Sequence, residues 1–417
     1  MRILDLTAAT EARLIRLREG QDRAAYRAST RIVADVRRRG DASLDAWSIK
    51  LDGVNLRQKG LWVSRTEMAA ARQRVPREFL RAVAHAAANA RRVAEKQMPR
   101  EWSLTVEPGV TVAQLIRPID SIGCYIPGGR FALFSTLVMT VVPAQVAGVR
   151  RIVAVCPGAN DELLAAADLL GVTHLARIGG AQAIAALAYG TKRIAPVEKI
   201  FGPGNRFVTA AKQIVSSDCA IDLPAGPTEA IVLARRGNPS WITSDLLAQA
   251  EHAPDAGSYL VTSSPQLAQK VKQEVAAQLN LLPRNNPAHA SCRTTGAILL
   301  ARTWEQALDF VNRFAPEHLS LPVGAPSLLK KIRSSGTIFL GPLSAQPFGD
   351  YASGSNHVLP TGGWARRRGG LSISDFVKQI SVQTIDRVGY RRLASDVQML
   401  ARAEGLLAHA NAVEVRK

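Results

Sequence analysis

The chain has 417 residues, which indicates more than one domain because single hydrophobic cores rarely grow beyond about 250–300 residues. Hydrophobic residues make up 47% and charged residues 21%, which excludes wholesale disorder, a collagen-like chain and a membrane bundle. Lys and Arg number 53 against 34 Asp and Glu, so the net charge is +19. Such a charge is compatible with a nucleic-acid partner, with attraction of anionic metabolites or with a merely basic surface.

The basic residues are spread along the chain and form only two tight runs, Arg37–Arg39 and Arg366–Arg368. Neither run carries the interleaved aromatic side chains on which nucleic-acid bases stack. We therefore favour a solvated basic surface over nucleic-acid binding. Four cysteines without a C-x-x-C pair predict no disulfide framework and no thiolate metal site, and no secretory signal or membrane span is evident. We expect a cytoplasmic protein.

In chain order, the first hundred residues are predicted to be mostly helical, with helices over 30–39 and 76–97. Short β-branched runs then alternate with Ala-rich helical stretches. The predicted strands are Ile152–Cys156, His174–Ile178, Lys199–Phe201, Ala230–Leu233, Tyr259–Thr262, Ala297–Leu300 and Thr337–Leu340. The predicted helices between them are Asp161–Leu170, Ala181–Tyr189, Arg206–Val215, Ser240–Glu251 and Thr303–Phe314. This alternation predicts an α/β fold with two units built on parallel sheets, followed after Ala365 by a helical tail without a strand.

Nucleotide-binding fingerprints are absent, since neither G-x-G-x-x-G nor G-x-x-x-x-G-K-[ST] occurs. Three weaker features remain, namely Pro127-Gly128-Gly129, Gly179-Gly180 and the Gly202–Asn205 turn, and the last two precede predicted helices. Glycines at such places let backbone N–H groups approach an anion. On local grounds alone we favour ordinary turns, with Asn205 as a helix N-cap.

Gln249 and His252 are three residues apart near the end of a predicted helix, so both side chains emerge on one face. Asp350 lies in a Gly/Ser-rich loop that also holds His357. Nitrogen and oxygen donors without thiolate suit zinc or a similar first-row ion. The alternative for the Gln249–His252 pair is a capping or surface role.

Glu317 and His318 directly follow Ala315-Pro316, and the proline is expected to end the preceding helix. We therefore expect a carboxylate and an imidazole side by side on a loop. Such a pair could divide acid and base duties at neutral pH. The alternative is a solvent-exposed pair without chemistry.

Taken together, eight segments resemble the histidinol dehydrogenases and run in the order found in that family. They are CYIPGGR (124–130), GGAQAIAALAYGT (179–191), FGPGNRFVTAAK (201–212), AGPTEAIVLA (225–234), DLLAQAEHAPDAGS (245–258), APEHLSL (315–321), GDYASGSNHVLPTGG (349–363) and EGLLAHANAVEVR (404–416). The resemblance covers the chain from about position 30 onward.

The resemblance implies oxidation of L-histidinol through L-histidinal to L-histidine, the last steps of histidine biosynthesis, with two NAD⁺ and one zinc ion per subunit. It implies two related, incomplete Rossmann-like domains of the aldehyde dehydrogenase-like superfamily. The implied division is a helical part at 1–118 joining the first domain, an NAD-side domain at 119–224, the remainder of the first domain at 225–365, and a tail at 366–417. Homodimers of the family exchange this tail, so each active site would be shared.

Site residues carried over from the resemblance fall into four groups. Those implied to hold zinc are Gln249, His252, Asp350 and His409. Glu317 and His318 are implied to move protons. The residues implied to contact substrate are Thr228, His357 and Glu404, together with the zinc ligands and the Glu317–His318 pair. Those that match NAD-contacting positions are Tyr125, Gln182 and Asn205.

Two positions depart from the commonest pattern of the family. Thr228 stands where serine is usual, so it keeps a hydroxyl but adds a methyl group. Arg130 also appears in the related sulfopropanediol dehydrogenases, whose anionic substrate would favour a cation. The alternative substrate is therefore an anionic alcohol such as 2,3-dihydroxypropane-1-sulfonate. Retention of Glu404, His409 and the Glu317–His318 pair favours histidinol.

Overall fold

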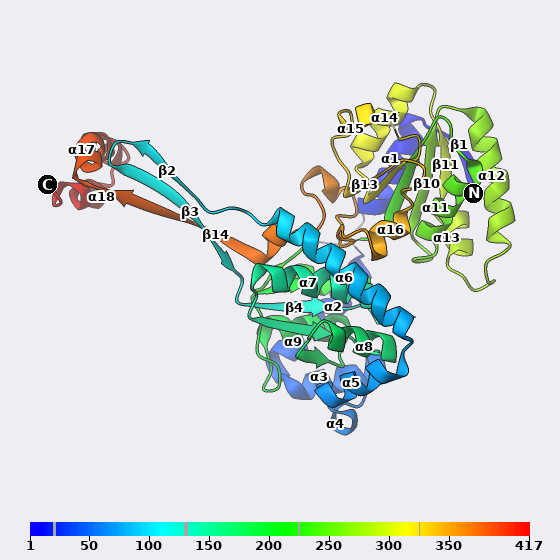
Figure 1. Cartoon of the computed structure of the whole chain (residues 1–417), viewed down its shortest axis with the longest axis horizontal. Helices are drawn as coiled ribbons and strands as arrows, with labels where there is room; N and C mark the ends of the chain where they lie inside the picture. Colours follow the sequence, from blue (N-terminus) through cyan, green and yellow to red (C-terminus); the bar gives the residue numbers. More distant parts are fainter. Residues whose placement is uncertain (20–21, 129–131, 224–225, 325) are drawn as a thin grey trace.

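A computed structural model of the chain describes residues 1–19, 22–128, 132–223, 226–324 and 326–417. Two α/β domains lie side by side, and a long arm carries the C-terminus away from both of them (Figure 1). The predicted α/β class with two parallel sheets is confirmed. No helix in the described ranges is long and apolar enough to cross a bilayer.

The first domain contains a six-stranded parallel sheet in the order β1-β11-β10-β9-β12-β13. Its strands are β1 (Arg2–Asp5), β9 (Glu229–Leu233), β10 (Gly257–Thr262), β11 (Ala297–Leu300), β12 (His318–Leu321) and β13 (Thr337–Leu340). Its helices are α1 (Ala8–Glu19), α11 (Pro239–Ala250), α12 (Pro265–Leu279), α13 (Ala288–Thr294), α14 (Trp304–Phe314), α15 (Pro326–Leu329) and α16 (Gln346–Tyr351). Ile231 and Leu233 pack with α1 and α14, whereas Val232 faces α11 and α12, as the two-residue period of a strand requires.

The second domain contains a five-stranded parallel sheet in the order β6-β5-β4-β7-β8. Its strands are β4 (Ser121–Tyr125), β5 (Arg151–Val155), β6 (His174–Ala176), β7 (Lys199–Phe201) and β8 (Ala220–Ile221). The crossover helices are α7 (Phe134–Ala147), α8 (Asp161–Leu169), α9 (Gly180–Tyr189) and α10 (Arg206–Val215). Buried apolar side chains fill the space on both faces of this sheet.

The N-terminal helices belong to the second domain, which corrects the assignment of residues 1–118 to the first. They are α2 (Arg23–Arg39), α3 (Asp41–Trp47), α4 (Leu56–Lys59), α5 (Arg65–Arg74) and α6 (Arg77–Gln97). The apolar stripes of α2, α3 and α4 pack on α9 and α10, and those of α5 and α6 pack on α7 and α8. Among the described N-terminal elements, β1 pairs with β11 in the six-stranded sheet, and α1 packs against that sheet.

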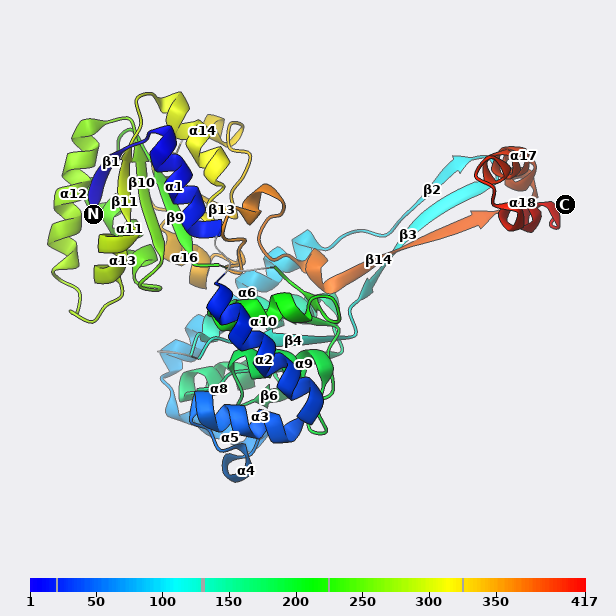
Figure 2. The same ribbon diagram turned by 180° about the vertical axis from the view of Figure 1, so that it is seen from behind.

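The arm is an antiparallel sheet in the order β14-β3-β2, which ends in two helices (Figure 2). Its elements are β2 (Trp102–Glu107), β3 (Val110–Pro118), β14 (Val377–Ile385), α17 (Arg387–Ala403) and α18 (Leu407–Glu414). The expectation of a strand-free tail is therefore wrong. All nine residues of β14 pair with β3, a partner more than 250 residues earlier, and local sequence carries no signal of that pairing.

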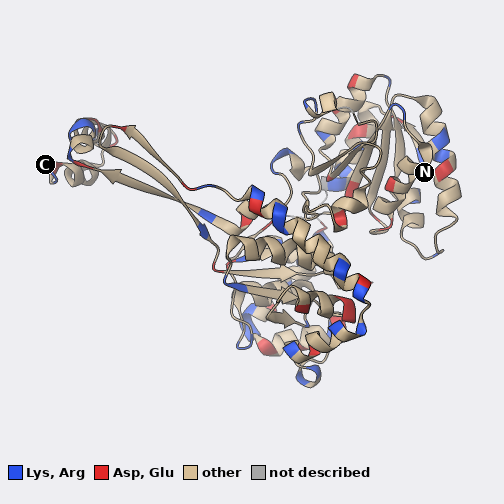
Figure 3. Cartoon of the chain, viewed as in Figure 1, with Lys and Arg blue, Asp and Glu red and all other residues tan. Residues whose placement is uncertain are grey.

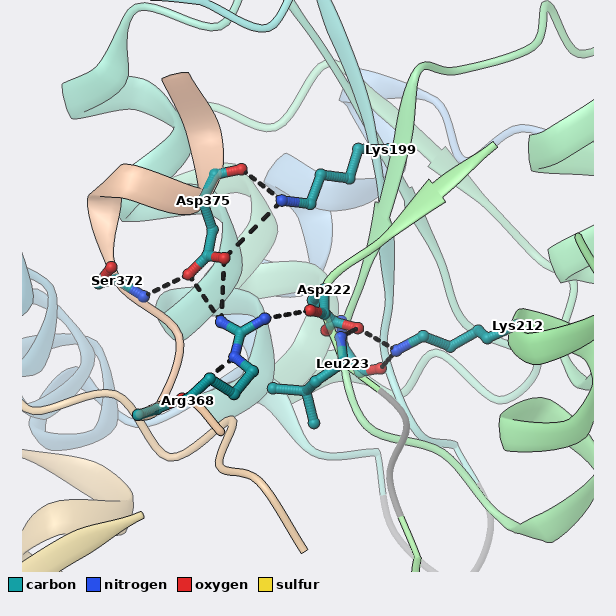
Figure 4. Close-up of polar contacts among 9 residues, drawn as sticks. Lys199, Lys212, Asp222, Leu223, Arg368, Ser372 and Asp375 are labelled. Carbon is teal, nitrogen blue, oxygen red and sulfur yellow. Dashed lines mark hydrogen bonds and ion pairs between the residues drawn. The ribbon is translucent and has the colours of Figure 1, made fainter. Parts of the chain in front are cut away.

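Charged side chains connect the start of the arm, just before β14, to the second domain (Figure 4). The Arg368 guanidinium donates to both carboxylate oxygens of Asp375 and to the carbonyl oxygen of Asp222. The Asp222 carboxylate is paired with Lys212, and both side chains are almost fully buried. Between them they hold Gly202, whose N–H donates to Asp222 and whose carbonyl accepts from Lys212.

We expect Lys212→Met to destabilise the second domain by about 3–5 kcal/mol, because it leaves the Asp222 carboxylate buried without a cation. Lys212→Met combined with Asp222→Asn should recover part of this loss. Arg74→Met is the control, because it breaks an exposed pair with Asp161 and should cost far less stability than Lys212→Met. Urea unfolding measures all three, and equal losses in Lys212→Met and Arg74→Met would contradict the assignment.

Candidate active site

Glu317 and His318 are buried at the amino edge of the six-stranded sheet. Ala315 ends α14 with a left-handed backbone (φ 53°), and Pro316 then leads the chain into β12, whose first residue is His318. The pair is therefore not on an exposed loop. The chain instead turns tightly from helix to strand and carries both side chains into the interior.

The Glu317 carboxylate is held by two donors. The Thr228 hydroxyl donates to Glu317 Oε2 at 2.6 Å, and the Glu229 backbone N–H donates to the same oxygen at 3.0 Å. Because Thr228 and Glu229 lie at the start of β9, the neighbouring strand of the sheet fixes the carboxylate.

His318 lies between two carboxylates and a carbonyl. Its Nδ1 lies 3.2 Å from the Glu229 carbonyl oxygen and 3.7 Å from Glu317 Oε2, and its Nε2 lies 3.8 Å from Asp350 Oδ1. Burial alone would lower the pKa of His318, but the carboxylates of Glu317 and Asp350 outweigh burial and raise it. The buried Nε2 has no hydrogen-bond partner within the described ranges, so its lone pair or proton is available to a bound molecule.

Gln249 and Asp350 lie beside this pair, and His252 is exposed but close enough to Asp350 for its charge to lower the pKa of that carboxyl. The Gln249 amide donates to the Thr228 hydroxyl at 2.9 Å and accepts from the Gln346 amide at 2.8 Å. His252 follows the end of α11, and its Nδ1 lies 2.9 Å from the Ala248 carbonyl oxygen. A proton on Nδ1 leaves Nε2 with a free lone pair, the form in which histidine binds metals.

His357 joins this cluster to the second domain. Its Nδ1 lies 2.9 Å from the Asp350 carbonyl oxygen, and its Nε2 lies 3.2 Å from the hydroxyl of Thr136 in the first turn of α7. Burial lowers the pKa of His357. Because α7 follows β4, its first turn lies at the carboxyl edge of the five-stranded sheet, and that edge therefore adjoins the amino edge of the other sheet.

Glu404 and His409 lie apart from all the other predicted site residues. Both are exposed, Glu404 at the end of α17 and His409 in α18, at the tip of the arm. The two views agree that this tip lies away from both domains (Figures 1 and 2). A single chain therefore gathers Gln249, His252 and Asp350 but neither tip residue.

The donors present fit a metal ion only in part. In the described portion of one chain, no three His, Cys, Asp or Glu side chains are placed to hold a metal ion together. The chain offers an imidazole nitrogen, a carboxylate and an amide oxygen, from His252, Asp350 and Gln249. Zinc with four such ligands requires one more donor.

Tyr125, Gln182 and Asn205 lie at the carboxyl edge of the five-stranded sheet, on both sides of the point where the strand order reverses. Tyr125 ends β4, and its hydroxyl accepts from the Gly180 N–H at 3.1 Å. Asn205 caps α10 by accepting from Phe207 N and Val208 N, which confirms the expected N-cap. Gln182 is buried in the first turn of α9.

Three residues around the site were not found by sequence reasoning, namely Gln346, Thr136 and Asp52. Asp52 accepts from the Gln182 amide at 2.9 Å and from the Gly179 N–H at 3.3 Å. Burial raises the pKa of Asp52. Each of the three acts through a partner more than 90 residues away, so no local spacing marks it. Arg130, the residue behind the alternative substrate, lies outside the described residues.

Comparison with known proteins gives consistent matches. A family model described as histidinol dehydrogenase matches residues 16–417. The histidinol dehydrogenase of Methanothermobacter thermautotrophicus is 46% identical over 392 residues, covering 92% of each chain. That of Geobacillus kaustophilus is 46% identical over 397 residues, covering 94% of this chain and 93% of its own. The crystal structure of histidinol dehydrogenase from Elizabethkingia anophelis superposes with a TM-score of 0.93 at 36% identity, covering 100% of this chain and 98% of that one.

Proposed function

The chain belongs to the histidinol dehydrogenase family, and we propose that it oxidises L-histidinol through L-histidinal to L-histidine with zinc and two NAD⁺. It is an oxidoreductase of histidine biosynthesis. The observation that carries the proposed chemistry is the buried, unpartnered Nε2 of His318 beside Glu317 and the Gln249–His252–Asp350 cluster.

His318 accepts the hydroxyl proton of histidinol while a hydride leaves the carbon that bears this hydroxyl and passes to NAD⁺. Its raised pKa suits this role, because a more basic imidazole takes a proton more readily. Glu317, fixed by the Thr228 hydroxyl and the Glu229 N–H, then takes a proton from the water that adds to the aldehyde, while His318 returns its proton to the carbonyl oxygen, so that a gem-diol forms and His318 is neutral again. A second hydride transfer to a second NAD⁺ completes the carboxylate, and His318 accepts the second hydroxyl proton.

Gln249, His252 and Asp350 would hold zinc together with His409 of the partner subunit. When bound, zinc supplies a Lewis acid that can fix the amine and imidazole of the substrate. The hydrogen bonds of the Gln249 amide to Thr228 and Gln346 fix its orientation before any metal binds. Tyr125, Gln182 and Asn205 would contact NAD⁺.

We propose a homodimer with exchanged arms, and the surface of the arm supports this proposal. Large apolar side chains are exposed along it, among them Leu104 (57%), Met399 (69%) and Leu407 (71%). Water-exposed apolar surface of this extent marks an interface. A second copy covers it and at the same time brings Glu404 and His409 to the incomplete cluster. The two copies would form two equivalent shared sites, as twofold symmetry requires.

Nucleic-acid binding finds no support in the distribution of charge. Lys and Arg are spread over both domains and the helical tip of the arm (Figure 3). Many are paired with carboxylates, as in Arg74–Asp161 and Arg206–Asp22. The net charge of +19 therefore corresponds to a basic surface of an enzyme with a small-molecule substrate.

Purified protein should reduce two NAD⁺ for each L-histidinol, measured by absorbance of NADH at substrate exhaustion. Treatment with a chelator should abolish turnover, and added Zn²⁺ should restore it. The matched assay uses 2,3-dihydroxypropane-1-sulfonate. Turnover of the sulfonate without turnover of histidinol would contradict the proposed substrate and favour the anionic alcohol.

His318→Asn should lower turnover by about 10²–10⁴-fold, the usual contribution of a proton-transfer group. Its zinc content after dialysis should stay near that of the parent, because His318 is not a ligand in this account. His252→Asn is the matched variant and should lose zinc. Equal loss of metal from the two variants would show that His318 had been assigned the wrong role.

A further inference from the structure

A buried guanidinium lies beside the segments that carry the Glu317–His318 pair, in contact with Glu229 and Phe314. It belongs to Arg18, near the end of α1, and its side chain is only 7% exposed. One terminal nitrogen donates to the Phe314 carbonyl oxygen at 2.6 Å, and the other donates to Glu229 Oε1 at 2.7 Å. The guanidinium also lies over the Phe314 ring, 3.5 Å from its centroid.

The two partners of Arg18 lie in the two segments that fix the proton-handling pair. Phe314 ends α14, three residues before Glu317. The backbone of Glu229 contacts both members of the pair, since its N–H donates to Glu317 and its carbonyl oxygen lies 3.2 Å from His318 Nδ1. Arg18 therefore ties the start of β9 to the turn that leads into β12.

Glu229 connects Arg18 to the Glu317–His318 pair, because its side chain binds Arg18 and its backbone contacts the pair. It is fully buried and accepts from Arg18 and from the Gly362 N–H, in the turn after His357. Burial raises the pKa of Glu229 to about 8, although Arg18 opposes the rise and nearby Glu317 adds to it. Arg18 thereby favours the charged form of Glu229 beside the Glu317 carboxylate.

We propose that Arg18, acting through Glu229, is a positioning residue that holds Glu317 and His318 in the geometry required for proton transfer. The inference rests on the proposed function, since it takes those two residues as the groups that move protons. It assigns a role in the reaction to α1, an element that packs against the sheet and contributes no side chain to the site itself.

If Arg18 has this role, replacing it should lower kcat without comparable changes in the binding of NAD⁺ or zinc. Arg18→Met should lower kcat for histidinol about 10- to 100-fold, because displacements of about 1 Å at reacting groups have effects of this size. The KM for NAD⁺ and the zinc content should stay within about twofold of the parent, because Arg18 contacts neither group of residues. Arg18→Lys keeps the charge and one donor, so its kcat should lie between those of Arg18→Met and the parent.

Arg16→Met is the matched control, because Arg16 lies on the exposed side of the same helix and should leave kcat unchanged. If Arg18→Met does not fold, Glu229→Gln gives the same readout with the side-chain shape preserved. A kcat within twofold of the parent in folded Arg18→Met or Glu229→Gln would overturn the proposal, even with a lowered melting temperature. A parent protein without histidinol turnover would instead refute the proposed function.

Discussion

The length of the arm is the constraint on which the active site depends. Glu404 and His409 are carried beyond the nine-residue strands β3 and β14, at a tip that lies away from both domains. Gln249, His252 and Asp350, by contrast, are fixed to α11 and α16 of the first domain. No rearrangement of side chains can bring the two groups together within one chain. We propose that a second copy completes the site, and the exposed apolar residues of the arm are the surface that this copy would cover.

The two sheets contribute to the site by opposite edges. In the second domain, Tyr125, Gln182 and Asn205 lie at the carboxyl edge, where parallel α/β sheets ordinarily bind ligands. In the first domain, Glu317 and His318 lie at the amino edge, and the carboxyl-terminal end of α11 brings Gln249 beside them. The contacts of His357 with Asp350 and Thr136 join the two edges. In the proposed function, a hydride donor bound by the first domain would meet a nicotinamide bound by the second.

Much of the fold could be predicted where the local signal was strong. The strands Lys199–Phe201, Ala297–Leu300 and Thr337–Leu340 match the prediction residue for residue, because each is a short apolar run. Long-range pairing could not be predicted, so β14 and the place of α2–α6 were missed. Residue types suggested the ligands and the Glu317–His318 pair, and the family resemblance supplied the rest of the site. Gln346, Asp52 and Arg18 act through distant partners and became visible only in three dimensions.

The shared site is tested most directly by mixing subunits that carry different defects. One subunit carries Glu317→Gln in its body, and the other carries His409→Asn at its arm tip. If arms are exchanged, each mixed dimer holds one site with an intact body and an intact tip, and random mixing restores about a quarter of parental activity. If each chain builds its own site, every site in the mixed dimers carries a defect. Recovery is the result predicted here, and verified mixed dimers without activity would contradict the account.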